Sequence, residues 1–107
     1  MADYLQVVTT TGSRDDAARL GRSAVEARLA ACAQVVGPNG STYWWNGTVE
    51  DAEEWLVLLK TTADHADALR DHIRERHSYE TPEIVTLPIV SGNPAYLSWI
   101  AAETRPR

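Results

Sequence analysis

The chain has 107 residues, a net charge of −5 at neutral pH, 44% hydrophobic residues and 23% charged residues. These values are typical of a globular domain with a modest core, so residues 1–107 are expected to form a single domain. An acidic chain without a clustered basic segment is not expected to bind nucleic acid. The apolar runs are too short to cross a bilayer, so no membrane partner is expected. One cysteine, Cys32, excludes an internal disulfide and favours a reducing cytoplasm.

The first third of the chain predicts a strand followed by a helix. Residues 4–10 are rich in β-branched and aromatic side chains, which favours a strand. Ser13 is a suitable N-cap, and apolar residues at helical spacing then continue to about Ala30. Because the apolar side of this helix is mostly small, the helix should approach a sheet closely.

The middle of the chain predicts a long hairpin. Strand character at 32–36 and 41–45 is interrupted by Gly-Pro-Asn-Gly at 37–40, which indicates a strand end or an edge bulge. The Asn-Gly pair at 46–47 favours a tight turn with two positive φ angles. A return strand is expected over 48–61.

The last third predicts a helix, a strand and a short helix. A helix capped by Thr62 or Asp64 should end near His77, with both of its other histidines on the solvated side. Residues 83–90 predict a strand that lies at an edge or carries a bulge, because they contain a proline. Asn93, followed by proline, should cap the final helix.

This order of elements, β-α-β-β-α-β-α, matches the split βαββαβ of ferredoxin-like folds. The predicted fold class is therefore α+β: an antiparallel sheet with helices on one face, plus a short C-terminal helix. Residues 55–59 are apolar on both faces of their strand. In a strand that is buried on one face only, apolar residues would alternate with polar ones. The second face needs a cover, and we expect a homo-oligomer to supply it.

Residues 77–83 read His-Ser-Tyr-Glu-Thr-Pro-Glu and hold the densest set of reactive groups in the chain. They lie between a predicted helix and a predicted strand, where loops commonly present binding groups. One wall of a site is expected here.

Five separated blocks resemble signatures of the CutA divalent-cation tolerance proteins. The blocks are LAACA at 29–33, STYWWNG at 41–47, EEWLVLLKTT at 53–62, HSYETPEI at 77–84 and YLSWI at 96–100. The resemblance spans about residues 4–103. It implies a ferredoxin-like homotrimer, cytoplasmic in bacteria, in which long hairpin strands pair between subunits. It also implies kinship with the PII signalling trimers.

The chain departs from the family pattern at positions that concern metal. The family usually has proline after the histidine of the fourth block, whereas this chain has Ser78. Copper binding in some CutA proteins is linked to a first-strand cysteine and a His-His pair. The matching positions here hold Thr9, Arg76 and His77. Of these three, only His77 has the side chain that is linked to copper binding in the family. The resemblance thus implies copper or another divalent cation as a candidate ligand, not a catalytic cofactor.

His77 and Cys32 are the candidate metal ligands, with Glu80 or Glu83 as oxygen donors, since copper and zinc favour imidazole and thiolate. Nothing in their spacing forms a ligand motif, so the fold or the oligomer would have to bring them together. The alternative is that Cys32 packs as a small hydrophobe and His77 hydrogen-bonds across its loop.

The second candidate site is an intersubunit cleft that binds a small anionic ligand. Its predicted lining combines aromatic and charged side chains: Trp45, Glu54, Lys60, Tyr79, Glu80 and Trp99. Lys60, the only lysine in the chain, could reach an anion or one of the two carboxylates. It could equally form a structural ion pair at a subunit boundary.

Three functions follow: a trimer that binds or responds to divalent metal, a PII-like trimer that binds a small ligand, and a non-catalytic scaffold. No enzymatic activity is predicted. The carboxylate and Cys-His pairs lack an identifiable orienting group or oxyanion stabiliser, and no phosphate-binding loop is present.

Overall fold

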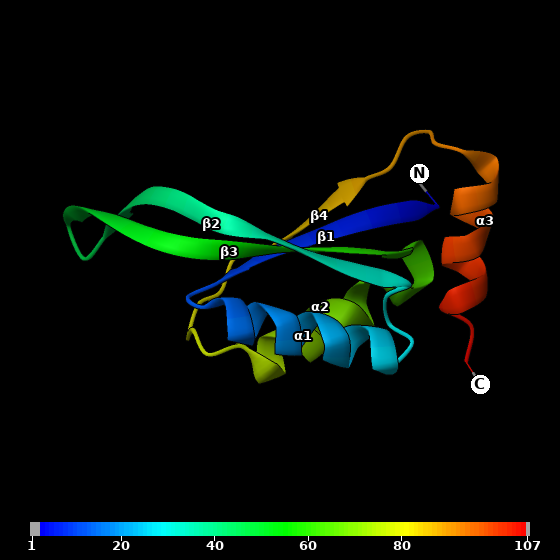
Figure 1. Ribbon diagram of the computed structural model, residues 1–107, viewed down its shortest axis with the longest axis horizontal. Coiled ribbons are helices and arrows are strands. Elements are labelled where there is room, and N and C mark those ends of the chain that lie inside the picture. Colours follow the sequence, from blue (N-terminus) through cyan, green and yellow to red (C-terminus); the bar gives the residue numbers. More distant parts are fainter. Residues whose placement is uncertain (1–2, 107) are drawn as a thin grey trace.

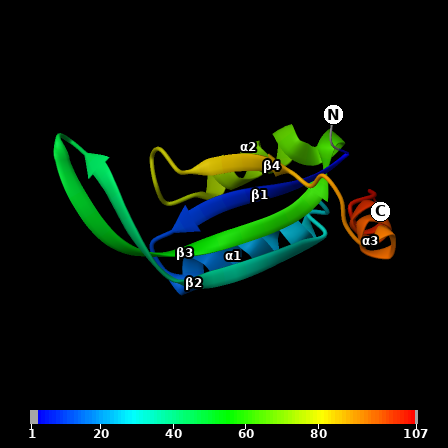
Figure 2. The same ribbon diagram turned by 90° about the horizontal axis from the view of Figure 1, so that it is seen from above.

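A computed structural model describes residues 3–106. The elements are β1 (Tyr4–Thr11), α1 (Arg14–Glu26), β2 (Cys32–Trp45), β3 (Thr48–Thr62), the 3-10 turn η1 (Ala63–His65), α2 (Ala66–Arg76), β4 (Ile84–Pro88) and α3 (Pro94–Glu103). The strands form one antiparallel sheet in the order β2-β3-β1-β4. Helices α1 and α2 cover one face, and α3 lies at the end opposite the hairpin tip (Figures 1 and 2). The predicted α+β class is confirmed.

Two of the predicted helix starts are confirmed by hydrogen bonds. The Ser13 hydroxyl accepts from the Asp16 amide at 3.1 Å, and the Asn93 side chain accepts from the Ala95 amide at 3.2 Å. Each bond satisfies one of the amides that a helix leaves unpaired in its first turn.

The predicted end of α1 is wrong by one turn. The helix ends at Glu26 instead of Ala30, because Arg28 adopts a left-handed φ of 62° and turns the chain back. The Ala31 amide then donates to the Lys60 carbonyl at 2.8 Å. At Ala31 the chain therefore already bonds to β3 and is no longer helical.

The predicted cap of α2 is also wrong. Neither Thr62 nor Asp64 caps α2, because the 3-10 turn η1 intervenes and α2 begins only at Ala66. The Thr62 hydroxyl bonds instead to Asp64 and lies 2.9 Å from Nδ1 of His65.

The long hairpin is confirmed, with the glycine-proline segment as a bulge. β2 is continuous, and its pairing with β3 shifts between Val36 and Asn39. Asn46 and Gly47 have φ angles of 50° and 81°, the two positive values of the predicted tight turn. β1 pairs only with residues 55–62 of β3, so the rest of the hairpin projects beyond the sheet (Figure 1).

The last strand is confirmed as an edge strand but is shorter than predicted. β4 ends at Pro88, the residue that faces Leu5 of β1. The prolyl nitrogen has no hydrogen to donate, which an edge position tolerates.

The core lies between the sheet and the two helices. Its members are buried apolar side chains from both layers: Val7, Ala17, Leu20, Ala24, Ala30, Val57, Leu59, Leu69 and Ile73. The predicted close approach of α1 is confirmed, because a Cβ atom added to Gly21 would lie 2.8 Å from that of Ala33 on β2.

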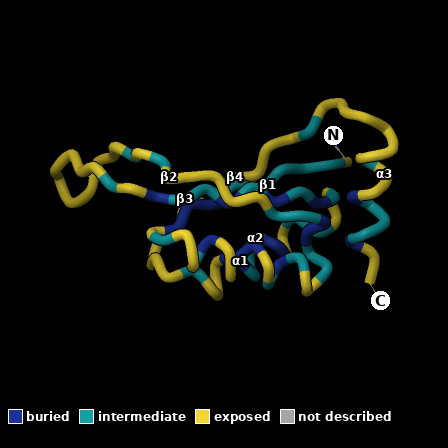
Figure 3. Tube along the Cα trace, in the orientation of Figure 1, coloured by how far each residue is buried: buried dark blue, intermediate teal, exposed yellow. Residues whose placement is uncertain are grey.

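Within residues 3–106, neither α1 nor α2 covers the opposite face of the sheet, here called the outer face. It carries the alternate strand residues Val8, Val36, Leu56, Leu58, Val85 and Leu87, which stand in register across the four strands. Val36, Val85 and Leu87 are each 46% exposed. Most of β4 is coloured as exposed in Figure 3.

One of the four tryptophans packs against the core, and the other three lie on the projecting hairpin and on α3. Trp55 packs against the core, whereas Trp44, Trp45 and Trp99 are 74%, 55% and 40% exposed. One chain alone therefore leaves three of these large rings in contact with solvent.

His65 and His72 are partly buried and hydrogen-bonded, whereas the sequence predicted a solvated position for both. His72 Nε2 lies 2.9 Å from the Ser23 hydroxyl, so it links α2 to α1, and burial together with nearby Arg76 lowers its pKa. The His65 side chain is only 19% exposed.

Gly21→Val should lower the free energy of unfolding by about 1–3 kcal/mol, because the added side chain must displace β2. Ala18→Val, on the exposed side of the same helix, is the matched control and should cost less than about 1 kcal/mol through helix propensity. Chemical denaturation followed by circular dichroism measures both. Equal losses would mean that the helix does not press on the sheet at Gly21.

Candidate functional site

The loop formed by residues 77–83 passes the end of β1, where the hairpin leaves the sheet. His77 Nε2 lies 2.7 Å from the Thr10 carbonyl oxygen, and Nδ1 accepts from the Tyr79 amide at 3.0 Å. Because Nδ1 is an acceptor, the proton resides on Nε2, which donates to Thr10. Both ring nitrogens of His77 are therefore occupied in holding the loop against β1.

Tyr79 and Glu54 form the central contact of the site. The Tyr79 hydroxyl donates to Glu54 Oε2 at 2.9 Å, and Glu54 is only 8% exposed. Burial, followed by the hydrogen bond and the charge of Glu54, raises the pKa of Tyr79 to about 12. Tyr79 thus remains a neutral donor to a buried carboxylate at physiological pH.

A cavity of about 560 Å³ opens beside this pair. We call it the hairpin cleft. Its lining residues are Thr10, Ser41, Thr42, Tyr43, Trp45, Glu54, Tyr79, Glu80, Thr81 and Glu83. Four of the six predicted cleft residues therefore meet here. Sequence reasoning missed Tyr43, although the alternation of residues 41, 43 and 45 along one strand places them on one face.

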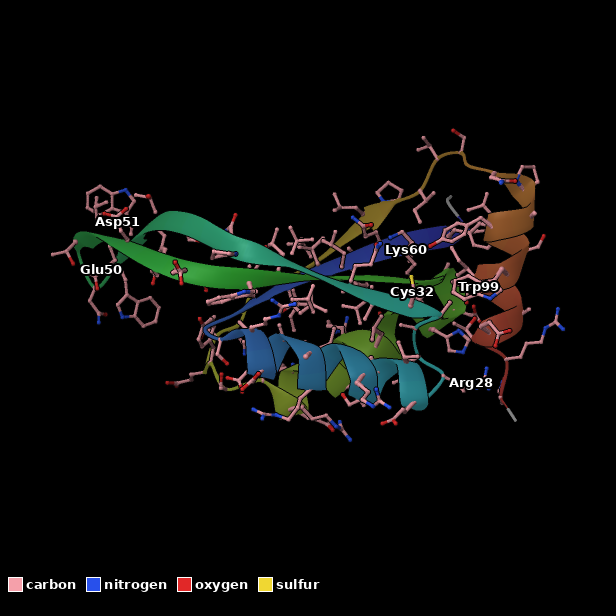
Figure 4. The ribbon with its side chains drawn as sticks, in the orientation of Figure 1. Arg28, Cys32, Glu50, Asp51, Lys60 and Trp99 are labelled. Atoms are coloured by element: carbon pink, nitrogen blue, oxygen red, sulfur yellow. The ribbon has the colours of Figure 1, made fainter. Side chains whose placement is uncertain are left out.

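The other two predicted cleft residues lie at the α3 end of the sheet (Figure 4). Lys60 faces Cys32 and Gln6 in the strand register, and its ammonium group donates to Gln34 at 2.7 Å. It stands six residues from Glu54 along β3, about 20 Å at the usual strand rise. Within one chain, Lys60 therefore does not reach the carboxylates of the cleft.

Trp99 belongs to a separate hollow. Its ring stacks on Tyr96 with centroids 5.6 Å apart, and it lines a cavity of about 530 Å³ with Arg28 and Glu103. Arg28 also forms an ion pair with Glu103 at 2.9 Å. Within one chain, the predicted six-residue cleft is therefore divided between two ends of the sheet.

The candidate metal ligands are separated in the same way. Cys32 Sγ lies 3.5 Å from the Tyr96 hydroxyl, a hydrogen bond that raises the pKa of Tyr96 to about 12. His77 lies beyond the other end of β1, against Thr10. Within residues 3–106, no group of three or more His, Cys, Asp or Glu side chains is arranged to hold a metal ion.

The remaining copper-linked positions do not fit a copper ligand set. Thr9 is fully buried, and its hydroxyl has no hydrogen-bond partner among the described residues. Arg76 is exposed and donates to the His72 carbonyl. Neither offers the thiolate or imidazole that copper favours.

The charge of the hairpin cleft disfavours an anion. Three carboxylates line it, from Glu54, Glu80 and Glu83, and none of its ten described lining residues is Lys, Arg or His. The small anion expected from Lys60 would need a basic group from outside this chain.

The element order, the strand order and the two helices on one face define a ferredoxin-like α+β protein. Residues 5–103 match the family model described as CutA1 divalent ion tolerance protein. The chain therefore belongs to the CutA1 divalent ion tolerance protein family, as the sequence blocks predicted.

Curated relatives agree with this assignment. A divalent-cation tolerance protein CutA from Pectobacterium atrosepticum is 35% identical over 98% of this chain and 96% of its own length. A CutA protein of the same name from Thermus thermophilus is 40% identical over 92% of this chain and 95% of its own length. The chain spans 56% of the length of the rice chloroplastic protein CutA 1, to which it is 38% identical over 92% of its own residues.

Solved structures also agree. CutA from Xylella fastidiosa superposes with a TM-score of 0.94 at 33% identity, covering 97% of this chain and 100% of that one. Relatives differ in their named compartments, since the rice protein is chloroplastic and one from Archaeoglobus fulgidus is called periplasmic. Among the described residues, no helix is both long and apolar enough to cross a membrane.

Tyr79→Phe should flatten the dependence of stability on pH between about 10 and 12. Unfolded tyrosine ionises near pH 10, whereas folded Tyr79 keeps its proton to about pH 12. The contribution of Tyr79 to the free energy of unfolding is thus complete below pH 10 and is lost as the pH rises through about 12. Thermal midpoints of the wild type should fall more steeply over this interval than those of the variant. Parallel curves would contradict the shift.

Proposed function

We propose that this chain acts in divalent-cation tolerance as a non-catalytic homotrimer in the cytoplasm, and that it binds or responds to a divalent metal ion such as copper. The observation that carries the assembly is the uncovered outer face, together with a hairpin that projects beyond its own core. Family membership supports the link to divalent cations.

The hairpin needs a partner for physical reasons. Beyond the end of β1 it is a two-stranded ribbon, and such ribbons are marginally stable alone in water. Trp44 and Val49 on this ribbon are 74% and 53% exposed. Packing against other copies in a closed, symmetric oligomer would cover both these side chains and the outer face.

In such a trimer, a divalent cation would bind between subunits, with ligands from more than one copy of the chain. His77 and Cys32 lie apart within one chain, so a shared site would need ligands from different subunits. Of the two, the Cys32 thiol is the less engaged, because its contact is one long hydrogen bond. Copper remains the first metal to test, since it favours thiolate.

A second candidate function is a PII-like trimer that binds a small molecule. The volume of the hairpin cleft, about 560 Å³, favours this because it lies in the usual range for small-molecule sites. In this arrangement Lys60 and Trp99 of a neighbouring copy would complete the cleft. A scaffold without a ligand is the third possibility.

Leu58→Asp should dissociate the oligomer, because it buries a charge at the centre of the outer face. Light scattering should give three times the 11.8 kDa mass of one chain for the wild type and a lower mass for the variant. Ala68→Asp, on the exposed side of α2, is the matched control and should keep the wild-type mass. A wild-type monomer would overturn the proposed assembly.

Calorimetric titration with Cu²⁺ should show that Cys32→Ser weakens binding by at least about tenfold, since thiolate is the softer ligand. His77→Ala should change the affinity by less than about threefold, because both nitrogens of that ring already hold hydrogen bonds. A large loss with His77→Ala would instead place the imidazole on the metal.

The cellular arm of this test uses a bacterial strain that lacks its own protein of this family. Expression of the wild-type chain should raise the CuSO₄ concentration that the strain survives, and Cys32→Ser should do so less. Equal survival with and without the chain would contradict the tolerance role.

A further inference from the structure

A histidine joins the two helices that cover the sheet. His72 on α2 and Ser23 on α1 are 49 positions apart in the chain, yet His72 Nε2 lies 2.9 Å from the Ser23 hydroxyl oxygen. This hydroxyl donates its one hydrogen to the Leu20 carbonyl at 2.8 Å, so the imidazole is the donor to Ser23. Neutral His72 therefore satisfies the contact through Nε2, and a proton taken up at low pH would enter at Nδ1.

The surroundings of this contact disfavour an added positive charge. Ser23 lines a groove of about 420 Å³ between α1 and the end of α2. Three guanidinium groups line the same groove: Arg19, Arg22 and Arg76. Its two carboxylates, Asp16 and Glu26 of α1, already form ion pairs with the first two of these arginines. A protonated imidazole beside the groove would therefore add positive charge where arginine already prevails.

The protonation of His72 is linked to the packing of the helices. Burial, followed by the charge of Arg76, lowers the pKa of His72 below its usual 6.5. Glu75 on the same helix acts in the opposite direction, but it is paired with Arg76 at 3.8 Å. Because the unfolded chain takes up the proton first, the stability that His72 supplies falls as the pH decreases through 6.5 toward the folded pKa.

The place of His72 in the fold connects this contact to the loop formed by residues 77–83. Helix α2 ends at Arg76, four residues after His72, and the loop starts directly there. The position of α2 therefore sets where the loop begins. The contact lies on the helix side of the sheet, opposite the outer face that other copies would cover (Figure 1). Covering the outer face thus leaves the contact between the helices in place.

We propose that the contact between His72 and Ser23 is an acid-sensitive switch. While His72 is neutral it holds α2 against α1, and when it takes up a proton the end of α2 and the loop that follows become less firmly packed. This switch goes beyond the proposed role in cation tolerance, because it requires neither a metal ion nor a second copy of the chain.

Hydrogen–deuterium exchange of the full-length chain at about pH 7.5 and about pH 5.5, on either side of the usual histidine pKa, tests the switch. After correction for the intrinsic effect of pH on exchange, amides in residues 73–83 should lose protection by at least about twofold at the lower pH. The amides that pair β1 with β3 are the internal reference and should lose less. An equal loss in both regions, or no loss in residues 73–83, would overturn the proposal.

His72→Gln is the decisive variant, because its side-chain amide can still donate to Ser23 but takes up no proton. It should show the same protection in residues 73–83 at both pH values. His65→Gln is the matched control: it removes the other partly buried histidine near the start of α2 and should keep the wild-type loss. His77 and the carboxylates are common to all three proteins, so their effects cancel at a given pH. A wild-type loss in His72→Gln would contradict the switch.

Ser23→Ala tests the same contact from the other helix. It keeps the histidine but removes its partner, so residues 73–76 should exchange at least about twofold faster than in the wild type already at neutral pH. Alanine favours a helix more than serine does, so this loss would not come from helix propensity. Unchanged exchange would mean that the hydrogen bond does not hold α2. Circular dichroism and light scattering check that each variant stays folded and assembled.

Discussion

The difference in length between β3 and β1 governs the structure. β3 has 15 residues and β1 has 8, so β1 can pair only with the second half of its neighbour. The first half of β3, paired with β2, must leave the sheet as a free ribbon. Where β1 ends, the loop formed by residues 77–83 crosses and brings Tyr79 against Glu54. The hairpin cleft exists because two strands continue past a point where the third stops.

The same sheet explains why one copy is incomplete. Helices α1 and α2 bury the face that carries Val57 and Leu59, and small residues such as Gly21 let α1 lie close to it. The outer face also carries apolar residues, such as Leu56 and Leu58, but neither α1 nor α2 covers it. A sheet that is apolar on both faces requires two covers, and this chain supplies only one. That requirement links the fold to the proposed assembly.

The sequence predicted a cleft between subunits, and one chain brings together only part of its lining. Trp45, Glu54, Tyr79 and Glu80 do lie together, since the hairpin and the loop that carry them were recognised as strand and connection. Lys60 was assigned to the same cleft as the only lysine of the chain, at a boundary between subunits. Its six-residue separation from Glu54 on a straight strand places it at the other end of the sheet, where Gln34 holds it.

The amino-acid sequence by itself determined the element order, the tight hairpin turn, two helix caps and the family. These depend on local patterns and on the order of motifs, which need no knowledge of distant contacts. Only the tertiary structure decided that both nitrogens of His77 are occupied and that the Tyr79 hydroxyl donates to Glu54. Two of those contacts join residues 67 and 25 positions apart, and the path of one loop past the end of β1 sets them.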